Sequence, residues 1–382
     1  MVNKQRTVII GGGVIGSATA FFISRHPNFD PKKHEVVIVE AVYPGCAASG
    51  KAGGLLSRTA FPANLGPLSY KLHQQLAKEF DGANKWGFRQ VTTMSIEGSD
   101  ALSDGNTKLP KDLDWIDPDM VEYAETLGKP GDFSQVHPYW LTNFFVQYAK
   151  DACALNVITG KVSQITVNKE GKCNGVVYLS EGASQPEFLE ADNVIVTAGP
   201  WTSKLISTCP IVGMKVPSIT VAPTENVSAY ALFTELELKN TGHVAPEIYA
   251  RQQEIYICGE TIDDPLPDYA SEIEVDESYG NALFSFGSTL SKNIAGGAIK
   301  RRQACYLPVV DSPYTSGPFI GPTNVDGLLL AAGHTCWGIN NAPATGLLMS
   351  ELLLDGSAKS SNIRSLRPSA YFDSSKNVTY HE

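Results

Sequence analysis

The sequence lacks the features that mark several common classes of protein. Its seven cysteines form no Cys-x-x-Cys pair and are odd in number, which argues against a metal site or a disulfide framework and suits a reducing compartment. No stretch is rich in lysine and arginine, the formal net charge is −10 and the pI is about 5.3. We therefore expect no nucleic-acid partner and no attraction to an anionic membrane surface. The cysteines are Cys46, Cys153, Cys173, Cys209, Cys258, Cys305 and Cys336.

A membrane span and a targeting segment are not expected either. Residues 7–24 contain no charge, but glycines interrupt them and a charged loop follows, unlike a transmembrane helix. A predicted strand begins close to the N-terminus and leaves no room for a signal or transit peptide, and the last residues are not a peroxisomal signal. We therefore expect a cytoplasmic protein, and 382 residues give it room for two lobes.

A strand, a tight turn and a helix are predicted at residues 7–24. Thr7–Ile10 are β-branched and mostly apolar, as in a buried parallel strand, and Gly11, Gly13 and Gly16 follow in the spacing G-x-G-x-x-G. Gly11 permits the turn, Gly13 lets a pyrophosphate approach the backbone, and Gly16 lets the helix lie close to the strand. The phosphates of a bound dinucleotide would lie at the positive end of the helix dipole.

An acidic residue ends the next apolar run. Val36–Val39 read as a second buried strand, and Glu40 follows directly. Its carboxylate can accept hydrogen bonds from both hydroxyls of an adenosine ribose, and it would repel a 2′-phosphate. The pattern therefore predicts FAD or NAD as the ligand and excludes NADP.

Three further stretches are expected near this turn. Residues 44–57 are small, glycine-rich and almost uncharged, which suits a segment lying against a flat ligand, although an ordinary flexible loop is the alternative. Residues 193–201 are a buried strand that stops at a Gly-Pro pair, and residues 327–346 are a strand closed by Gly333 and a helix beginning near Pro343. Ligands of open α/β sheets lie beyond the carboxyl ends of the strands, so these stretches should meet in one crevice.

The remaining periodic segments alternate between helix and strand. Apolar residues recur with helical spacing over 65–85 and over 138–154. A short strand is predicted at 156–158, followed by a hairpin of 162–167 and 175–179.

Three separated blocks together resemble a known family. They are the opening glycine fingerprint, VIVTAGPW at 194–201 and GHTCWGINNAPATG at 333–346. In this order they resemble the FAD-dependent oxidoreductases of the D-amino-acid oxidase type, which include enzymes that oxidise glycine, sarcosine and dimethylglycine. The resemblance spans residues 7–356, and the overall layout is most similar to a fungal branch of oxidoreductases associated with late endosome to Golgi transport.

The resemblance implies an α/β fold in which a Rossmann-like FAD-binding domain is interleaved with an antiparallel-sheet substrate domain. The FAD-binding domain is expected at 1–85, 141–204 and 306–382, including a C-terminal tail, and the substrate domain at 86–140 and 205–305. Such enzymes oxidise a C–N bond of a small amine or amino-acid-like substrate by hydride transfer to flavin N5, and the imine then hydrolyses. If the amine binds neutral, no strong protein base is needed and catalysis depends on positioning in a dry pocket.

The resemblance also implies which residues surround a noncovalently bound FAD. The glycine turn would hold the pyrophosphate, Glu40 the ribose and Val162 the adenine, and the block at 333–340 would surround the isoalloxazine. A helix N-terminus near Pro343 would stabilise the anionic reduced flavin. The predicted cofactor residues are Gly11, Gly13, Val14, Ile15, Gly16, Glu40, Ala41, Ser49, Lys51, Gly53, Gly54, Leu55, Val162, Ala198, Gly199, Trp201, Gly333, His334, Gly338, Ile339 and Asn340.

The substrate side departs from the family's pattern. Amino-acid oxidising members usually have an arginine before the proline of the penultimate strand, where it binds the substrate carboxylate bidentately. Here that position is Leu307, and strand alternation would turn the neighbouring Arg301 and Arg302 outward. Tyr306 or Tyr256 could offer a hydroxyl to a different substrate, although each is more often a core aromatic.

Four other side chains have a functional and a structural interpretation. Cys305 lies where the sarcosine oxidase branch attaches its flavin covalently, but a small buried residue is the commoner reading of a free cysteine. Lys51 could assist oxygen near the flavin or remain a solvated loop lysine. His334 could contact flavin or substrate or only bond to backbone, and Trp337 could cover the site or fill the lobe interface.

Two alternative functions stay open from the sequence. A protein with a structural FAD could act mainly by binding partners in late endosome to Golgi transport, with the acidic segment 263–277 as a contact surface, although such charge runs are usually solvated. An NAD-dependent dehydrogenase would need only the opening fingerprint, and the glycines at 50–54 and the final block argue against it. Substrate identity, electron acceptor and oligomeric state are not predicted.

Overall fold

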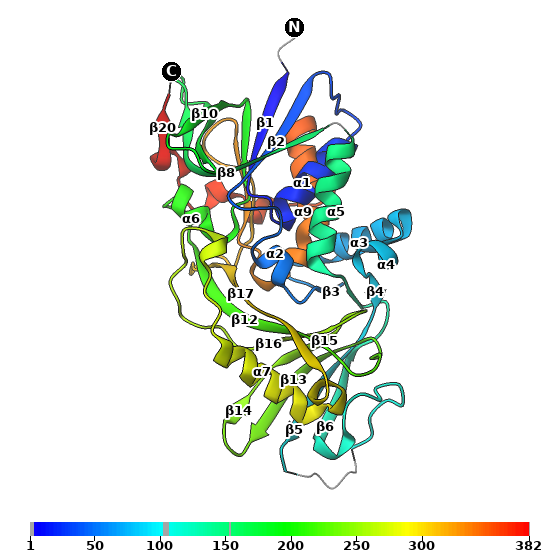
Figure 1. Ribbon diagram of the computed structural model, residues 1–382. Helices are drawn as coiled ribbons and strands as arrows, with labels where there is room; N and C mark the ends of the chain where they lie inside the picture. Colours follow the sequence, from blue (N-terminus) through cyan, green and yellow to red (C-terminus); the bar gives the residue numbers. More distant parts are fainter. Residues whose placement is uncertain (1–3, 102–106, 153, 382) are drawn as a thin grey trace.

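The computed structural model describes residues 4–101, 107–152 and 154–381. They form two lobes, each built on a large sheet, with one lobe above the other in Figure 1. The predicted α/β class with a second, sheet-based lobe is confirmed. The predicted boundaries between the interleaved domain segments remain a prediction.

The first lobe contains a nine-stranded sheet. Its strands are β1 (Gln5–Ile10), β2 (His34–Glu40), β8 (Leu155–Val167), β9 (Cys173–Ser180), β10 (Glu187–Glu190), β11 (Asn193–Val196), β18 (Phe319–Pro322), β19 (Leu328–Ala332) and β20 (Val378–Tyr380). β1 lies between β2 and β11, and its last residue Ile10 is in register with Val39 and Val196 in these parallel neighbours. β11 in turn pairs in parallel with β19. The carboxyl ends of β1, β2, β11 and β19 therefore lie at one edge of the sheet.

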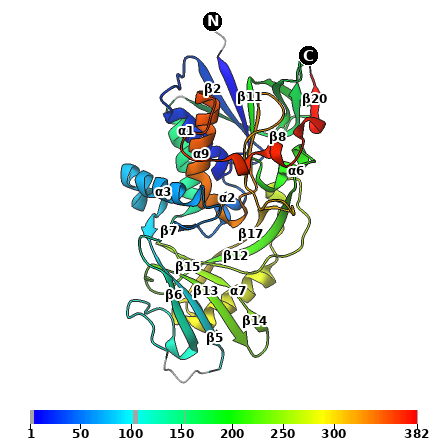
Figure 2. The ribbon, with the colours of Figure 1, turned by 180° about the vertical axis from the view of Figure 1, so that it is seen from behind.

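A layer of helices covers one face of this sheet (Figure 2). The helices of the first lobe are α1 (Val14–Arg25), α2 (Ala48–Lys51), α3 (Gly66–Phe80), α4 (Gly82–Trp86), α5 (Pro138–Asp151), α6 (Thr202–Leu205) and α9 (Gly338–Asp355). Phe21 of α1 is fully buried, and its ring centroid lies 4.9 Å from that of Phe145 in α5. A Cβ at Gly346 of α9 would lie 2.6 Å from the Ala18 carbonyl oxygen, so α1 and α9 can pack this closely only with glycine there.

The second lobe is an eight-stranded, mostly antiparallel sheet in the order β17-β12-β16-β15-β13-β5-β6, with β14 paired to β13. Its strands are β5 (Thr92–Ser99), β6 (Val121–Gly128), β12 (Ile211–Ala222), β13 (Tyr230–Leu238), β14 (Gly242–Val244), β15 (Glu247–Ala250), β16 (Ile255–Cys258) and β17 (Ala298–Val310). β13 and β5 are a parallel pair within it. Helices α7 (Glu277–Leu290) and α8 (Lys292–Ala295) lie on the side away from the first lobe (Figure 1).

A small sheet lies where the lobes meet. It consists of β3 (Leu55–Ser57), β7 (Phe133–Gln135) and β4 (Arg89–Gln90) in that order of pairing. β3 follows the glycine-rich stretch 44–57, of which residues 48–51 form the short helix α2. This stretch therefore runs from the first lobe's cleft to the second lobe.

Two predicted elements differ in detail from the structure. The helix predicted over 65–85 is interrupted at Asp81, which has a left-handed φ of 57° and separates α3 from α4. The short strand at 156–158 and the first hairpin strand are one continuous strand, β8, because β2 and β9 pair with successive parts of it.

The helix predicted to begin near Pro343 begins earlier, at Gly338, and Pro343 lies inside α9. Proline has no N–H, so the carbonyl of Ile339 loses its helical partner. The buried His73 lies 3.0 Å from the Ile339 carbonyl and 3.1 Å from that of Asn340 through Nε2. A donor from α3 thus replaces the missing helical hydrogen bond.

Within the described ranges, no helix combines the length and the apolar character needed to cross a bilayer.

Candidate functional site

A cleft of about 400 Å³ opens at the carboxyl ends of β1, β2, β11 and β19. It has the position that ligands take in open α/β sheets. Many of the predicted cofactor residues line it, from all three sequence blocks. They are Gly11, Gly13, Val14, Ile15, Glu40, Ala41, Ser49, Val162, Ala198, Gly199, Trp201, Gly333, His334, Gly338 and Ile339.

The glycine turn is shaped by close backbone approaches. Gly11 has a φ of 104°, and a Cβ there would lie 2.7 Å from the Thr197 carbonyl oxygen. A Cβ at Gly16 would lie 2.1 Å from the Gly11 oxygen and 2.6 Å from Thr197 Oγ1. Thr197 donates from Oγ1 to the Ile10 carbonyl over 2.9 Å. Since real Cβ atoms do not make such contacts, these two positions require glycine.

Gly13 and Ser49 meet at the N-terminus of α1. Ser49 Oγ accepts a hydrogen bond from the Val14 amide over 2.8 Å, and a Cβ at Gly13 would lie 3.0 Å from that oxygen. The backbone of this turn faces the cleft and combines open space with the positive end of a helix dipole. These features fit a bound pyrophosphate.

Glu40 is oriented by two backbone amides, one from the glycine turn and one from the loop that follows β2. Its Oε2 accepts from the Gly12 amide over 2.7 Å and its Oε1 from the Val42 amide over 3.0 Å. The side chain is buried and lines the cleft. Burial and the nearby Glu40 charge raise the pKa of the Cys46 thiol to about 12. Oε1 also accepts from Cys46 Sγ over 3.6 Å, whereas Oε2 keeps a lone pair, so the fixed carboxylate can accept a hydrogen bond from a ribose hydroxyl.

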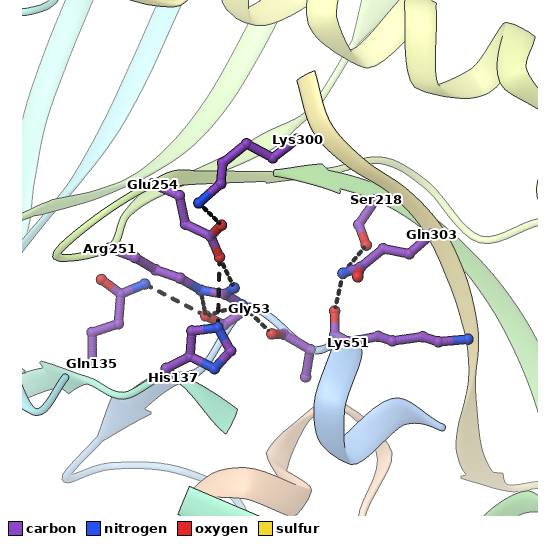
Figure 3. A network of polar contacts seen from close by, with 10 residues as sticks. Lys51, Gly53, Gln135, His137, Ser218, Arg251, Glu254, Lys300 and Gln303 are labelled. Carbon is purple, nitrogen blue, oxygen red and sulfur yellow. Dashed lines mark hydrogen bonds and ion pairs between the residues drawn. The ribbon is translucent and has the colours of Figure 1, made fainter. Parts of the chain in front are cut away.

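Side chains of the second lobe hold the segment 51–53 by its main chain (Figure 3). Gln303 donates from Nε2 to the Lys51 carbonyl over 2.9 Å. Arg251 donates to the Ala52 carbonyl and, over 3.1 Å, to the Gly53 carbonyl. Three consecutive carbonyls at the junction of the lobes are therefore fixed by two side chains from the facing sheet.

Arg251 belongs to a buried ionic network. Its guanidinium is bonded to Glu254 over 2.9 Å, and Glu254 also lies 3.7 Å from His137 and 3.4 Å from Lys300 (Figure 3). Burial has the largest single effect and raises the pKa of Glu254, but the charge and hydrogen bond of Arg251 and the charge of Lys300 act together against it, and the pKa is lowered overall. Burial and the Arg251 charge lower the pKa of His137 to about 4, so His137 is neutral and Arg251 is the compensating cation.

Two tyrosines of the second lobe face Gly53. Tyr249 and Tyr256 are cross-strand neighbours whose ring centroids lie 5.8 Å apart. A Cβ at Gly53 would lie 2.4 Å from the Tyr249 ring and 3.0 Å from the Tyr256 ring. The predicted candidate Tyr256 is thus buried on the sheet face turned toward the glycine-rich stretch, and burial raises its pKa well above 10.

Lys51 and Cys305 lie close together at the junction of α2 and β17. Lys51 donates from Nζ to the Ala304 carbonyl over 3.0 Å, and burial lowers its pKa. Cys305 is buried, and burial raises its pKa to about 11 despite the Lys51 charge. The thiol is therefore protonated at neutral pH, and a protonated thiol is a weak nucleophile.

The other three candidates differ in position. His334 lines the cleft, lies 3.1 Å from Thr345 Oγ1 through Nε2, and has a pKa lowered to about 3 by burial. Trp337 precedes α9, and its amide donates to the His334 carbonyl. Tyr306 donates to the Pro265 carbonyl over 2.7 Å and packs with Ile273. The structure therefore places Tyr306 on the sheet face opposite Cys305.

Some predicted cofactor residues do not line the cleft, and some lining residues were not predicted. Asn340 accepts from the Ser57 amide over 2.9 Å and thus supports β3. The predicted residues outside the cleft lining are Gly16, Lys51, Gly53, Gly54, Leu55 and Asn340, and unpredicted lining residues include Cys46, Ala52, Lys161, Lys204, Asp268, Thr335 and Cys336. Lys161 lies in β8 and Lys204 in α6, and neither belongs to a motif that marks a ligand site, so sequence reasoning did not assign them.

The acidic segment 263–277 contributes to the cleft. Asp268 pairs with Lys204 over 2.6 Å and with Lys161 over 3.3 Å, and all three line the cleft. Leu307 also lines it, whereas Arg301 and Arg302 are exposed. Arg302 donates to Asn281 of α7, on the side away from the first lobe. Arg301 shares the face of Gln303, which bonds to the Lys51 carbonyl, so the expectation that both arginines point outward is wrong for Arg301.

Comparison with known proteins agrees with this geometry. Residues 6–352 match the family described as DAO, FAD dependent oxidoreductase. TDA3 of Saccharomyces cerevisiae, provisionally named an oxidoreductase, is 32% identical over 500 residues, covering 97% of this chain and 95% of its own. A Schizosaccharomyces pombe protein with the same provisional description is 36% identical over 381 residues, covering 96% and 99%.

Solved structures show the same fold. Glycine oxidase from Geobacillus kaustophilus aligns with a TM-score of 0.70 at 18% identity, covering 95% of this chain and 98% of that one. Iminodiacetate oxidase from Chelativorans aligns with a TM-score of 0.72 at 17% identity, covering 95% and 99%. The match to an FAD-dependent family favours FAD over the NAD alternative. The chain belongs to the DAO family of FAD-dependent oxidoreductases.

Proposed function

We propose that this oxidoreductase binds FAD noncovalently and oxidises a C–N bond of a small amine or amino-acid-like substrate. The observation that supports this best is the position of the cleft. It joins a glycine turn, an oriented Glu40 and the block at 333–339 on one side to Leu307 and Pro308 of β17 on the other. Bound FAD would supply the acceptor for a hydride from the carbon next to the substrate nitrogen.

The chain's own residues would act by positioning and by excluding water. Tyr249 and Tyr256 are buried and protonated at neutral pH, since burial raises both pKa values well above 10. His334 has a pKa of about 3 and is a weak base. These groups do not favour proton abstraction, so the substrate would react as a neutral amine held against the cofactor.

The protonated thiol of Cys305 supports a noncovalent cofactor. The test is the visible absorption spectrum of the purified protein, repeated on the supernatant after acid precipitation. We expect a flavin spectrum that moves entirely into the supernatant. Colour retained in the pellet, and lost in a Cys305→Ala variant, would contradict noncovalent binding.

Oxidation of an amine is tested separately, by adding substrates to the flavin-loaded protein without air. We expect a small amine to bleach the flavin absorbance. If no amine or amino acid does so, the partner-binding alternative gains support. A role in late endosome to Golgi transport, and protein partners there, stay predictions from the resemblance.

A further inference from the structure

The long connection between β16 and α7 reaches from the second lobe to the cleft of the first. It comprises residues 259–276 and includes a short 3₁₀ turn at Ala270–Glu272. Figure 1 shows it beside α6 before it reaches α7. Asp268, Tyr269 and Ala270 of this connection line the cleft. Connections of this length in a compact protein are often lids over a binding site. We call residues 264–270 the strap.

The second lobe holds the strap at its beginning and directly after its end. Lys215 of β12 pairs with Asp264, and the Tyr306 hydroxyl of β17 donates to the Pro265 carbonyl over 2.7 Å. After the strap, Ile273 is buried and packs with Tyr306. The strap is therefore attached to the second lobe on both sides of its middle, residues 266–270.

Side chains of the first lobe bind the middle of the strap. Trp201 donates from Nε1 to the Pro267 carbonyl over 2.7 Å. Lys204 Nζ lies 2.6 Å from Asp268 Oδ1 and donates to the Pro267 carbonyl over 3.1 Å. Lys161 Nζ lies 3.3 Å from Asp268 Oδ2. The carboxylate of Asp268 thus joins the strap to two lysines from different elements of the first lobe, α6 and β8.

The ion pairs of Asp268 lie at the surface. The exposed fraction of the side chain is 62% for Asp268, 39% for Lys204 and 31% for Lys161. Hydrogen bonds from both lysines lower the pKa of Asp268, so its carboxylate is charged at neutral pH. Exposed ion pairs are individually weak and are screened by salt. These contacts can therefore break and form again while both sheets stay folded.

The strap lies at the end of the cleft where we expect the adenosine of FAD. Lys161 directly precedes Val162, the residue expected beside the adenine, and both line the cleft. Since Asp268 also lines the cleft and bonds to Lys161 and Lys204, the strap bridges this end of the cleft.

We infer that the strap closes over the adenosine end of bound FAD and that the ion pairs of Asp268 slow the release of the cofactor. This inference rests on the proposed noncovalent binding of FAD. Opening would separate Asp268 from Lys161 and Lys204 and uncover the cofactor. Opening of a lid in this way often limits the release of a bound molecule.

The test measures the release of FAD from the loaded full chain, followed by the fluorescence of free FAD after dilution. Asp268→Asn keeps the size of the side chain and removes its charge, and we expect it to release FAD about fivefold faster. Raising NaCl from about 0.05 M to about 0.5 M should accelerate release from the unmodified protein more than from this variant. Glu274→Gln, at an exposed acid of the same connection outside the cleft lining, should release FAD at the unmodified rate.

Amide hydrogen exchange separates opening of the strap from a general loss of stability. In the FAD-loaded protein, Asp268→Asn should speed exchange in residues 266–270 and leave exchange in β1 unchanged. Exchange that rises equally in both regions would overturn the inference, because faster release would then come from unfolding of the first lobe.

The outcomes separate this inference from the proposed function. Unchanged release and salt dependence in Asp268→Asn would overturn the inference and leave amine oxidation standing. Faster release from this variant, with no bleaching by any amine, would support the inference and contradict the oxidation. Flavin retained in the acid pellet would overturn the inference as well, because a covalently attached cofactor is not released.

Discussion

The two ends of the cleft are built by different kinds of contact. At the dinucleotide end, Gly11 and Gly16 meet backbone atoms of the same turn and of Thr197, and Glu40 is oriented by adjacent amides. At the junction of the lobes beside the cleft, where we propose that the substrate binds and which we call the substrate end, Arg251 and Gln303 reach from one lobe to the main chain of the other. The first end depends on small residues at fixed spacing, and the second depends on charged and polar side chains brought together by the fold. The two ends should therefore respond differently to substitution.

The largest effect is expected at the dinucleotide end. Gly16→Val would place a side chain where even a Cβ lies 2.1 Å from the Gly11 oxygen, so we expect FAD binding to fall more than about a hundredfold. Flavin absorbance at known protein concentration measures this. Ala63→Val, which enlarges a side chain at an exposed position outside the cleft lining, is the control for folding, and its midpoint of thermal unfolding should be unchanged. FAD retained in Gly16→Val would show that the turn does not hold the cofactor.

At the substrate end, Arg251→Met should mainly affect stability. It leaves Glu254 buried without its guanidinium partner, and breaking a buried ion pair in this way costs about 3 kcal/mol of unfolding free energy. Chemical denaturation measures the change. Arg302→Met, at an exposed arginine of the same sheet, should change stability by less than about 0.5 kcal/mol. Equal effects of the two variants would mean that the buried network does not stabilise the junction.

The pH dependence of the unfolding free energy tests the contact of His73 with α9, the helix that lies beside the dinucleotide end. Burial lowers the pKa of His73 to about 4, below the value of about 6.5 expected in the unfolded chain. As pH falls from about 6.5 toward 4, the unfolded chain takes up a proton that folded His73 does not, so stability is lost at up to about 1.4 kcal/mol per pH unit.

The variant His73→Gln separates titration from hydrogen bonding. The glutamine amide can still donate to the Ile339 carbonyl but does not titrate. We expect the unfolding free energy of this variant to fall less steeply between pH 6.5 and pH 4 than that of the unmodified protein, with a constant difference above pH 7.5. Parallel curves across the whole range would argue against a neutral, buried His73.

The smallest effect is expected at the ribose site. In the unmodified protein, two backbone amides donate to the two Glu40 carboxylate oxygens. Glu40→Gln removes the charge and replaces one of these oxygens with an N–H₂ group, which cannot accept the hydrogen bond. We expect the dissociation constant of FAD to rise about tenfold, which corresponds to about 1.4 kcal/mol. Glu35→Gln, on the same strand and paired with Arg6 at the surface, is the control and should leave FAD affinity unchanged. An unchanged dissociation constant of FAD in Glu40→Gln would mean that Glu40 does not bind the ribose.

The contrast between the two ends also explains what the sequence could predict. The glycine spacing, the acidic strand end and the three strand termini are local patterns, and the structure brings them to one cleft. The start of α9 was predicted wrongly, because His73 satisfies the carbonyl freed by Pro343 from a distant helix. Ser69 likewise accepts from the Ala344 amide. Such partners leave no signal near the proline.

The substrate end was predictable only in part. Tyr256 was recognised as a candidate, and Leu307 as a departure from the family's arginine. Tyr249 lies in the short strand β15 and Arg251 directly follows that strand, and the alternation of so short a strand gives no sign of which face meets the other lobe. That information comes from strand order, since β15 pairs with β16 only after the chain has passed through β12 and β13.

The bonds that join Gln303 and Arg251 to residues 51–53 end on main-chain carbonyls. Every amino acid has the same main-chain carbonyl, so these hydrogen bonds between the lobes do not depend on which side chains occupy positions 51 and 52. These two positions can therefore diverge during evolution, and with them the chemistry beside the cofactor, while the lobes keep their alignment. The exception is position 53, where the tyrosine rings admit only glycine.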